Sequence, residues 1–142
     1  MAPVSDKVRQ FFEGYERGAN GLDPEFPAAH FGDSFLFGDP AGARAVKKDD
    51  FLKMLPRRTE YFKTLGLASS KILSLEETRL DDHYVMVKAI WQMRFEKDPG
   101  QPIVDENSAT YVLYQQADSL RIVFQLDHQD LMQRAQALGL LP

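Results

Sequence analysis

The sequence contains no cysteine among its 142 residues. This excludes disulfides, thiolate metal sites and a cysteine nucleophile, and it suits a reducing compartment such as the cytoplasm. No apolar run approaches the length of a membrane span, and the first residues lack the core of a signal peptide. The 17 basic and 21 acidic residues are interspersed and give a net charge of −4. We therefore expect a cytoplasmic protein with no nucleic acid and no membrane as its partner.

Apolar and aromatic side chains are plentiful. Hydrophobic residues make up 44% of the chain, with ten Phe, five Tyr and one Trp. That composition argues against disorder, and the length is typical of one domain that buries a real core. We expect residues 1–142 to form a single domain.

Hydrophobic periodicity changes once along the chain, from a helical repeat to a repeat of two at residue 67. Before that point the turn and cap signals predict mainly helices, and after it they predict a series of long strands. In the first part we expect a helix from a Ser5 cap to residue 19, a short helix at 24–32, a short strand ending at Asp39 and a small strand at 43–46. A third helix should run from an Asp49 or Asp50 cap to Gly66, with a kink or break at Pro56. The second part should contain strands at 67–80, 84–95, 103–116 and 120–128 and a last helix at 131–138.

Helices followed by a run of antiparallel strands are typical of an α+β fold. We expect a curved antiparallel sheet wrapped around the N-terminal helices, forming a cone with an interior pocket. Alternation places Trp91 on the inner face of its strand, and it places Phe124 and His128 on one face of the last strand. Asp127 is predicted to lie on the opposite face from His128.

Asp39 is the residue that composition explains least. It continues the apolar face of Phe35 and Phe37 at the end of a short strand, just before Pro40. One interpretation is a carboxylate in an apolar cone, where desolvation raises its pKa and suits it to proton abstraction beside a carbonyl. The other is an Asx-turn, since Asp before Pro often caps its own turn.

The element order and the segment FGDSFLFGDPAG resemble the NTF2-like superfamily, with its SnoaL-like and ketosteroid isomerase-like branches and its cystatin-like α+β fold. Tyr15 on the first helix and the Asp39-Pro40 dipeptide are similar to the ketosteroid isomerase arrangement. The resemblance implies Asp39 as the base and Tyr15 as a donor to the enolate oxygen. A gap-free match for the second donor falls on Val112, which has no proton to give. Tyr111, shifted by one residue, could replace it only from the other side of the sheet.

Other residues have a structural and a functional interpretation. Tyr15 is either a core aromatic or a donor, and His128 is either a rim residue or a general acid or base. Arg57 and Arg58 are either solvated helix charges or a carboxylate-binding group at the mouth of the cone. The three histidines have no metal-ligand spacing, so we expect no metal and no cofactor. The candidate pocket walls are Phe12, Phe37, Trp91, Tyr111 and Phe124.

Two functions from different classes remain open. The first is a cofactor-free isomerase or cyclase that moves a proton on an apolar ketone-like substrate, with Asp39, Tyr15 and His128 as catalytic residues. The second is a non-catalytic ligand-binding or dimerisation module. Apolar residues on the outer sheet face, such as Tyr84 and Tyr114, favour a homodimer in either case.

Overall fold

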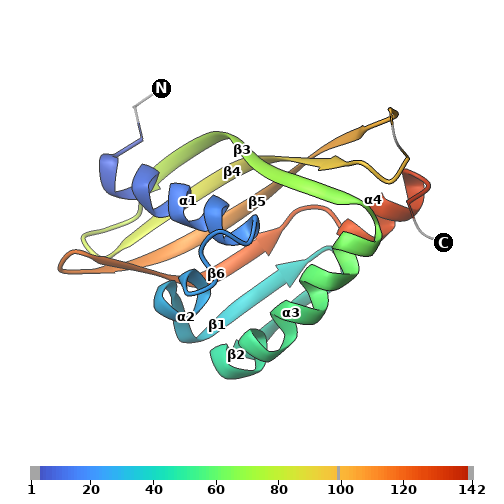
Figure 1. The fold of residues 1–142 in the computed structure, drawn as a ribbon. Helices are drawn as coiled ribbons and strands as arrows, with labels where there is room; N and C mark the ends of the chain where they lie inside the picture. The colour runs from blue at the N-terminus through green and yellow to red at the C-terminus, as the bar shows by residue number, and fades with distance from the viewer. Residues whose placement is uncertain (1–3, 99, 141–142) are drawn as a thin grey trace.

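The computed structural model describes residues 4–98 and 100–140. A six-stranded curved sheet, in the order β2-β1-β6-β5-β4-β3, carries the helices α1, α2 and α3 on one face (Figure 1). Neighbouring strands are antiparallel except β1 and β6, which are parallel. The elements are α1 Asp6–Ala19, α2 Phe26–His30, β1 Phe31–Asp39, β2 Gly42–Lys47, α3 Lys48–Thr64, β3 Leu67–Arg79, β4 Tyr84–Phe95, β5 Ile103–Gln116, β6 Ser119–Asp127 and α4 Leu131–Ala137. The predicted α+β fold is confirmed.

The first helix forms as its sequence predicts. The Ser5 hydroxyl accepts a hydrogen bond from the Val8 amide, which caps one of the free donors of the first turn. Val8, Phe11 and Phe12 recur on one face and are buried against the sheet. No helix among the described residues is long and apolar enough to span a bilayer.

Three predicted helix boundaries were wrong. The short helix begins at Phe26 rather than at Pro24, because the Phe26 amide bonds to the Asp23 carbonyl in a turn that precedes it. It ends at His30, and Gly32 already belongs to β1. The third helix is N-capped by Lys47 and not by Asp49 or Asp50, and it runs through Pro56 as one element although a proline lacks one ladder donor and crowds the preceding turn.

The inner face of the sheet was predicted correctly over β4. Its alternate residues, from Val85 through Trp91 to Phe95, are all buried against the helices. The same face of β5 presents Ala109, Tyr111 and Leu113 to the core. Tyr111 therefore lies inside the cone, next to Trp91 and not across the sheet from it.

The inner face of β6 was predicted wrongly beyond Ile122. Leu113 of β5 pairs with Ile122 whereas Val112 pairs with Phe124, so Val123 is an extra, unpaired residue in β6. Such a β-bulge shifts every later side chain to the other face. Gln125 and Asp127 point into the cone as a result, and Phe124 and His128 lie on the outer face, where the His128 ring is 2.7 Å from the Thr110 hydroxyl.

Candidate functional site

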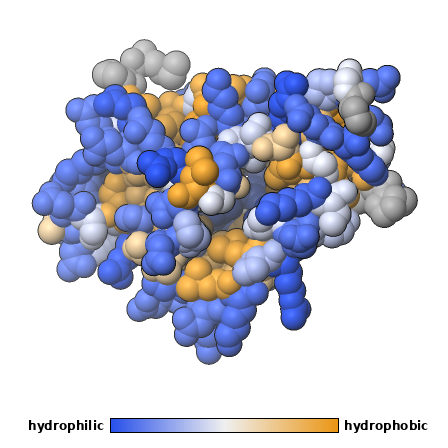
Figure 2. All heavy atoms as spheres, viewed as in Figure 1, coloured by the Kyte–Doolittle hydropathy of each residue, from blue (hydrophilic) through white to orange (hydrophobic). Residues whose placement is uncertain are grey.

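The main pocket lies at the open end of the cone, between α3, the β1–β2 hairpin, the end of β6 and the start of α4. Its volume is about 440 Å³, within the range of small-molecule sites. Aromatic and aliphatic side chains supply most of the wall: Phe35, Phe37, Val46, Phe51, Met54, Tyr61, Phe62, Leu131 and Met132. The polar lining consists of Asp39, Arg44, Asp50, Arg58, Asp127, Gln129 and Asp130. Figure 2 shows a hollow on this face of the molecule, edged by hydrophobic atoms and surrounded by hydrophilic ones.

Asp39 forms the predicted Asx-turn, and its side chain also lines the pocket. One carboxylate oxygen accepts a hydrogen bond from the Ala41 amide at 2.9 Å, which is the Asx-turn. The other oxygen lies 3.9 Å from the Arg44 guanidinium, and the side chain, 25% exposed, lines the pocket. The turn fixes the carboxylate in place, so one residue both ends the strand and faces the ligand space.

Asp127 is a pocket carboxylate that the sequence analysis placed on the wrong face. Burial raises its pKa above the usual 3.8, while the Arg58 charge and a hydrogen bond from Gln125 oppose that change. The nearby Asp39 charge raises it further. A carboxyl group with a raised pKa can exchange a proton with a ligand at mild pH.

Behind Asp127, a series of buried polar groups runs along the inner face of the sheet. The Tyr15 hydroxyl donates to the Gln125 side-chain oxygen at 3.2 Å, and the Trp91 indole donates to the Tyr111 hydroxyl at 3.1 Å. The two tyrosine hydroxyls are close enough to shift each other's pKa. Burial, together with the Asp127 charge, raises the pKa of Tyr15 to about 12, and burial and Tyr15 raise that of Tyr111 as well. Both tyrosines are therefore neutral hydrogen-bond donors at physiological pH.

The other predicted site residues divide into three groups. Phe37 lines the pocket beside Asp39. Phe12, Trp91 and Tyr111 pack together in the core beneath α1, and none of them is part of the pocket lining. Phe124 and His128 lie on the far face of the sheet, because of the bulge at Val123.

Arg58 enters the pocket, whereas its neighbour Arg57 is exposed. Its spacing from Phe51, Leu55 and Phe62 is that of one helical face, a signal in the sequence that could have separated it from Arg57. The guanidinium carbon lies 5.5 Å from the centroid of the Phe62 ring, a cation–π distance. Of this arginine pair, Arg58 alone lines the pocket, and its role there stays a prediction.

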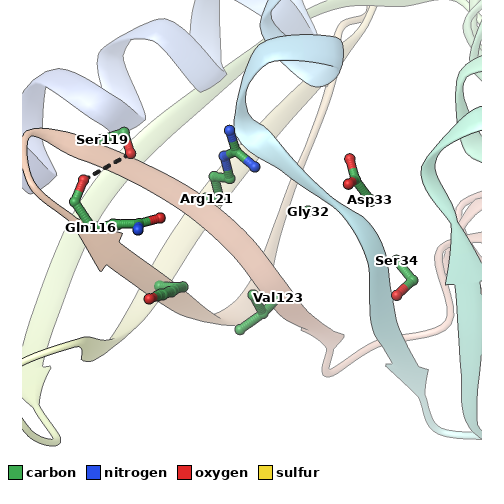
Figure 3. A pocket seen from close by; sticks show the side chains of 8 residues that line it. Gly32, Asp33, Ser34, Gln116, Ser119, Arg121 and Val123 are labelled. Carbon is green, nitrogen blue, oxygen red and sulfur yellow. Dashed lines mark hydrogen bonds between the residues drawn. The ribbon is translucent and has the colours of Figure 1, made fainter.

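A second, smaller hollow of about 290 Å³ lies on the outer face, where β1 begins beside the β5–β6 hairpin. Figure 3 shows its lining, with Arg121 and Val123 on β6, Gly32, Asp33 and Ser34 on β1, and a Ser119 hydroxyl bonded to the Gln116 carbonyl. Most of its lining residues carry polar side chains. Among residues 4–98 and 100–140, no group of three or more His, Asp or Glu side chains is arranged to hold a metal ion.

Comparisons with known proteins agree with this architecture. A family profile described as "NTF2-like protein (DUF6841)" matches residues 5–130. An NTF2-like protein of unknown function from Shewanella oneidensis MR-1 superposes with a TM-score of 0.69, at 17% identity, over 87% of this chain and 98% of its own. The protein Aln2 from a Streptomyces species gives a TM-score of 0.70 at 18% identity, over 95% and 99% of the two chains. A candidate ketosteroid isomerase from Shewanella frigidimarina gives 0.67 at 13% identity, over 87% and 95%. No curated protein matches the sequence.

Proposed function

Because this chain belongs to the NTF2-like protein family DUF6841, we propose that it binds a small, mostly apolar molecule in the pocket at the open end of its cone. The observation that carries this proposal is the pocket itself. It combines about 440 Å³ of space, walls of Phe35, Phe37, Phe51 and Phe62, and a few polar groups at fixed positions. Such a combination is typical of ligand sites, in which apolar walls supply affinity and polar groups orient the ligand.

Proton transfer within this pocket is a second candidate function. Asp39 and Asp127 both line the space, and burial raises the pKa of Asp127. The reaction would be of the isomerase or cyclase type, on a ketone-like ligand, with these carboxyl groups exchanging the proton. Tyr15 does not line the pocket, so in this proposal it is a positioning residue that acts through Gln125 on Asp127.

The binding proposal is tested by thermal unfolding in the presence of 2-naphthol and 2-acetonaphthone. A ligand that binds only the native state raises the unfolding temperature. At a ligand concentration of one hundred times Kd, the native state gains about 2.7 kcal/mol of stability. Met54→Trp places an indole at a pocket position that is 49% exposed and should abolish the shift. Leu73→Trp, at a 41% exposed site on β3 outside the pocket, is the matched control and should retain it. No shift in the wild type, or equal shifts in both variants, would contradict the proposal.

The outer face of the sheet is proposed to bind a second copy of the chain. Leu36, Tyr84 and Val104 are each between 39% and 48% exposed on this face, and an interface would remove their apolar surface from water. An isologous dimer would cover such a face twice. Light scattering that gives the mass of a monomer at micromolar concentration would contradict this assembly.

A further inference from the structure

Arg58 is a half-buried cation whose N–H groups have no hydrogen-bond acceptor within the part of the chain that the structure describes. Among residues 4–98 and 100–140 it takes part in no ion pair and no side-chain hydrogen bond. Arg134 on α4 shows the usual arrangement, in which the guanidinium bonds to the buried Asp105 carboxylate. The charge of Arg58 lowers the pKa of Asp127 from beyond ion-pair distance, so the guanidinium N–H groups have no acceptor among the described residues and can bind one supplied by a ligand.

The surroundings hold Arg58 at the pocket without using its N–H groups. The Phe62 ring lies beside its guanidinium carbon, and this contact consumes no hydrogen-bond donor. Arg44 lies over Phe37 in the same way, at 5.1 Å from the ring centroid, but it has Asp39 at 3.9 Å. Arg58 therefore offers a set of planar donors suited to a bidentate oxyanion.

The carboxylates that line the pocket are already engaged or solvated. Asp130 accepts hydrogen bonds from the Met132 and Gln133 amides as the cap of α4. Asp39 accepts a hydrogen bond from the Ala41 backbone amide, and Asp127 accepts one from the Gln125 side-chain amide. Asp50 is exposed in the first turn of α3. Four aspartates and two arginines line the pocket, and among the described residues Arg58 is the lining arginine that has no carboxylate within ion-pair distance.

We propose that the pocket selects molecules whose apolar body carries a carboxylate, and that Arg58 binds that carboxylate as the specificity-determining residue. The inference rests on the proposed function and narrows its ligand class from apolar molecules to apolar acids. The four phenylalanines of the wall contact the body of the ligand, and the acid group reaches the guanidinium through paired N–H···O bonds. Asp127, whose pKa is raised by burial, keeps a proton more readily than an ordinary aspartate and so repels the bound acid less.

The test measures Kd by titration calorimetry for three ligands with one ring system, namely 2-naphthoate, 2-acetonaphthone and 2-naphthylmethylamine. Each is titrated into the wild type, Arg58→Gln and Arg57→Gln. The last variant removes the same charge from the adjacent exposed position, and it is the matched control. We expect Arg58→Gln to weaken 2-naphthoate at least tenfold and Arg57→Gln to weaken it less than twofold. The affinity for 2-acetonaphthone should fall less in Arg58→Gln than the affinity for 2-naphthoate does, and the midpoint of urea unfolding shows that each variant is folded.

The outcomes separate the two proposals. Binding of the ketone together with absent, weaker or Arg58-independent binding of the acid would overturn the role of Arg58 and leave the proposed function standing. Tighter binding of the amine than of the acid would also overturn the role of Arg58. It would indicate that the aspartates of the pocket bind a cationic ligand. If none of the three ligands binds the wild type, the proposed function fails and this inference fails with it. Arg58→Lys, which keeps the charge and loses the planar fork, should show an intermediate affinity for the acid.

Discussion

The side-chain amide of Gln125 donates a hydrogen bond to the Asp127 carboxylate at 3.2 Å while its oxygen accepts one from Tyr15. The amide is thereby fixed in one orientation, and one Asp127 oxygen is fixed with it. Gln125 is only 6% exposed, so this connection lies behind the pocket and not in solvent. It joins the buried tyrosines of the core to the carboxyl group that faces the ligand space.

Replacing Gln125 by Leu should remove both hydrogen bonds at once. The buried Tyr15 hydroxyl would lose its acceptor, and we expect a loss of about 1–3 kcal/mol in the free energy of unfolding. Because the Gln125 amide lowers the pKa of Asp127, that pKa should also rise in the variant. Urea unfolding measures the first effect and a carboxyl NMR titration the second. The exposed Gln116→Leu is the control and should change stability by less than about 0.5 kcal/mol.

The raised pKa of Asp127 predicts a pH dependence of stability with a definite sign. In the unfolded chain Asp127 ionises near pH 3.8, and in the folded chain it ionises at a higher pH. Between these two pKa values the unfolded state therefore binds fewer protons than the folded state. The contribution of Asp127 to stability is therefore complete below the unfolded pKa and is lost as the pH rises through the folded value. Asp127→Asn, which cannot ionise, should gain stability relative to the wild type as the pH rises from the unfolded pKa through the folded one. A relative loss over this interval in urea unfolding would contradict the assignment.

Tyr15 should stay protonated at pH values where an ordinary tyrosine ionises. Its pKa is about 12 against the usual 10.0, chiefly because burial disfavours the phenolate. An ultraviolet spectrophotometric titration of the wild type minus that of Tyr15→Phe should give a single step near pH 12. The stability that the protonated hydroxyl contributes is complete below pH 10 and is lost between pH 10 and 12. A difference step near pH 10 would show that the hydroxyl is solvated.

How far the sequence predicts this structure depends on how local each signal is. The cap at Ser5 and the alternation of β4 are encoded by neighbouring residues, and both were predicted correctly. The bulge at Val123 arises from pairing with β5, a partner that local sequence does not reveal. Because of this one unpaired residue, Asp127 faces the pocket where the sequence predicted His128.

The corrected face of β6 is itself testable. His128→Ala removes an outer side chain that contacts Thr110, and it should leave the affinity for a pocket ligand within twofold. Asp127→Ala removes a side chain that lines the pocket, and it should change that affinity several-fold. Titration of 2-acetonaphthone into both variants compares adjacent residues of opposite orientation. Equal effects would contradict the bulge.

The most direct test of the pocket as a binding site uses the methionine methyl groups, which report from both faces of the sheet. Met54 and Met132 line the pocket, whereas Met86 lies on the outer face of β4. Protein labelled with ¹³C at these methyls is titrated with 2-acetonaphthone and followed by NMR. Binding in the pocket predicts saturable shifts of the Met54 and Met132 signals with one common Kd and no shift of Met86. Unmoved Met54 and Met132 signals, or a Met86 shift at the same ligand concentration, would contradict the central claim.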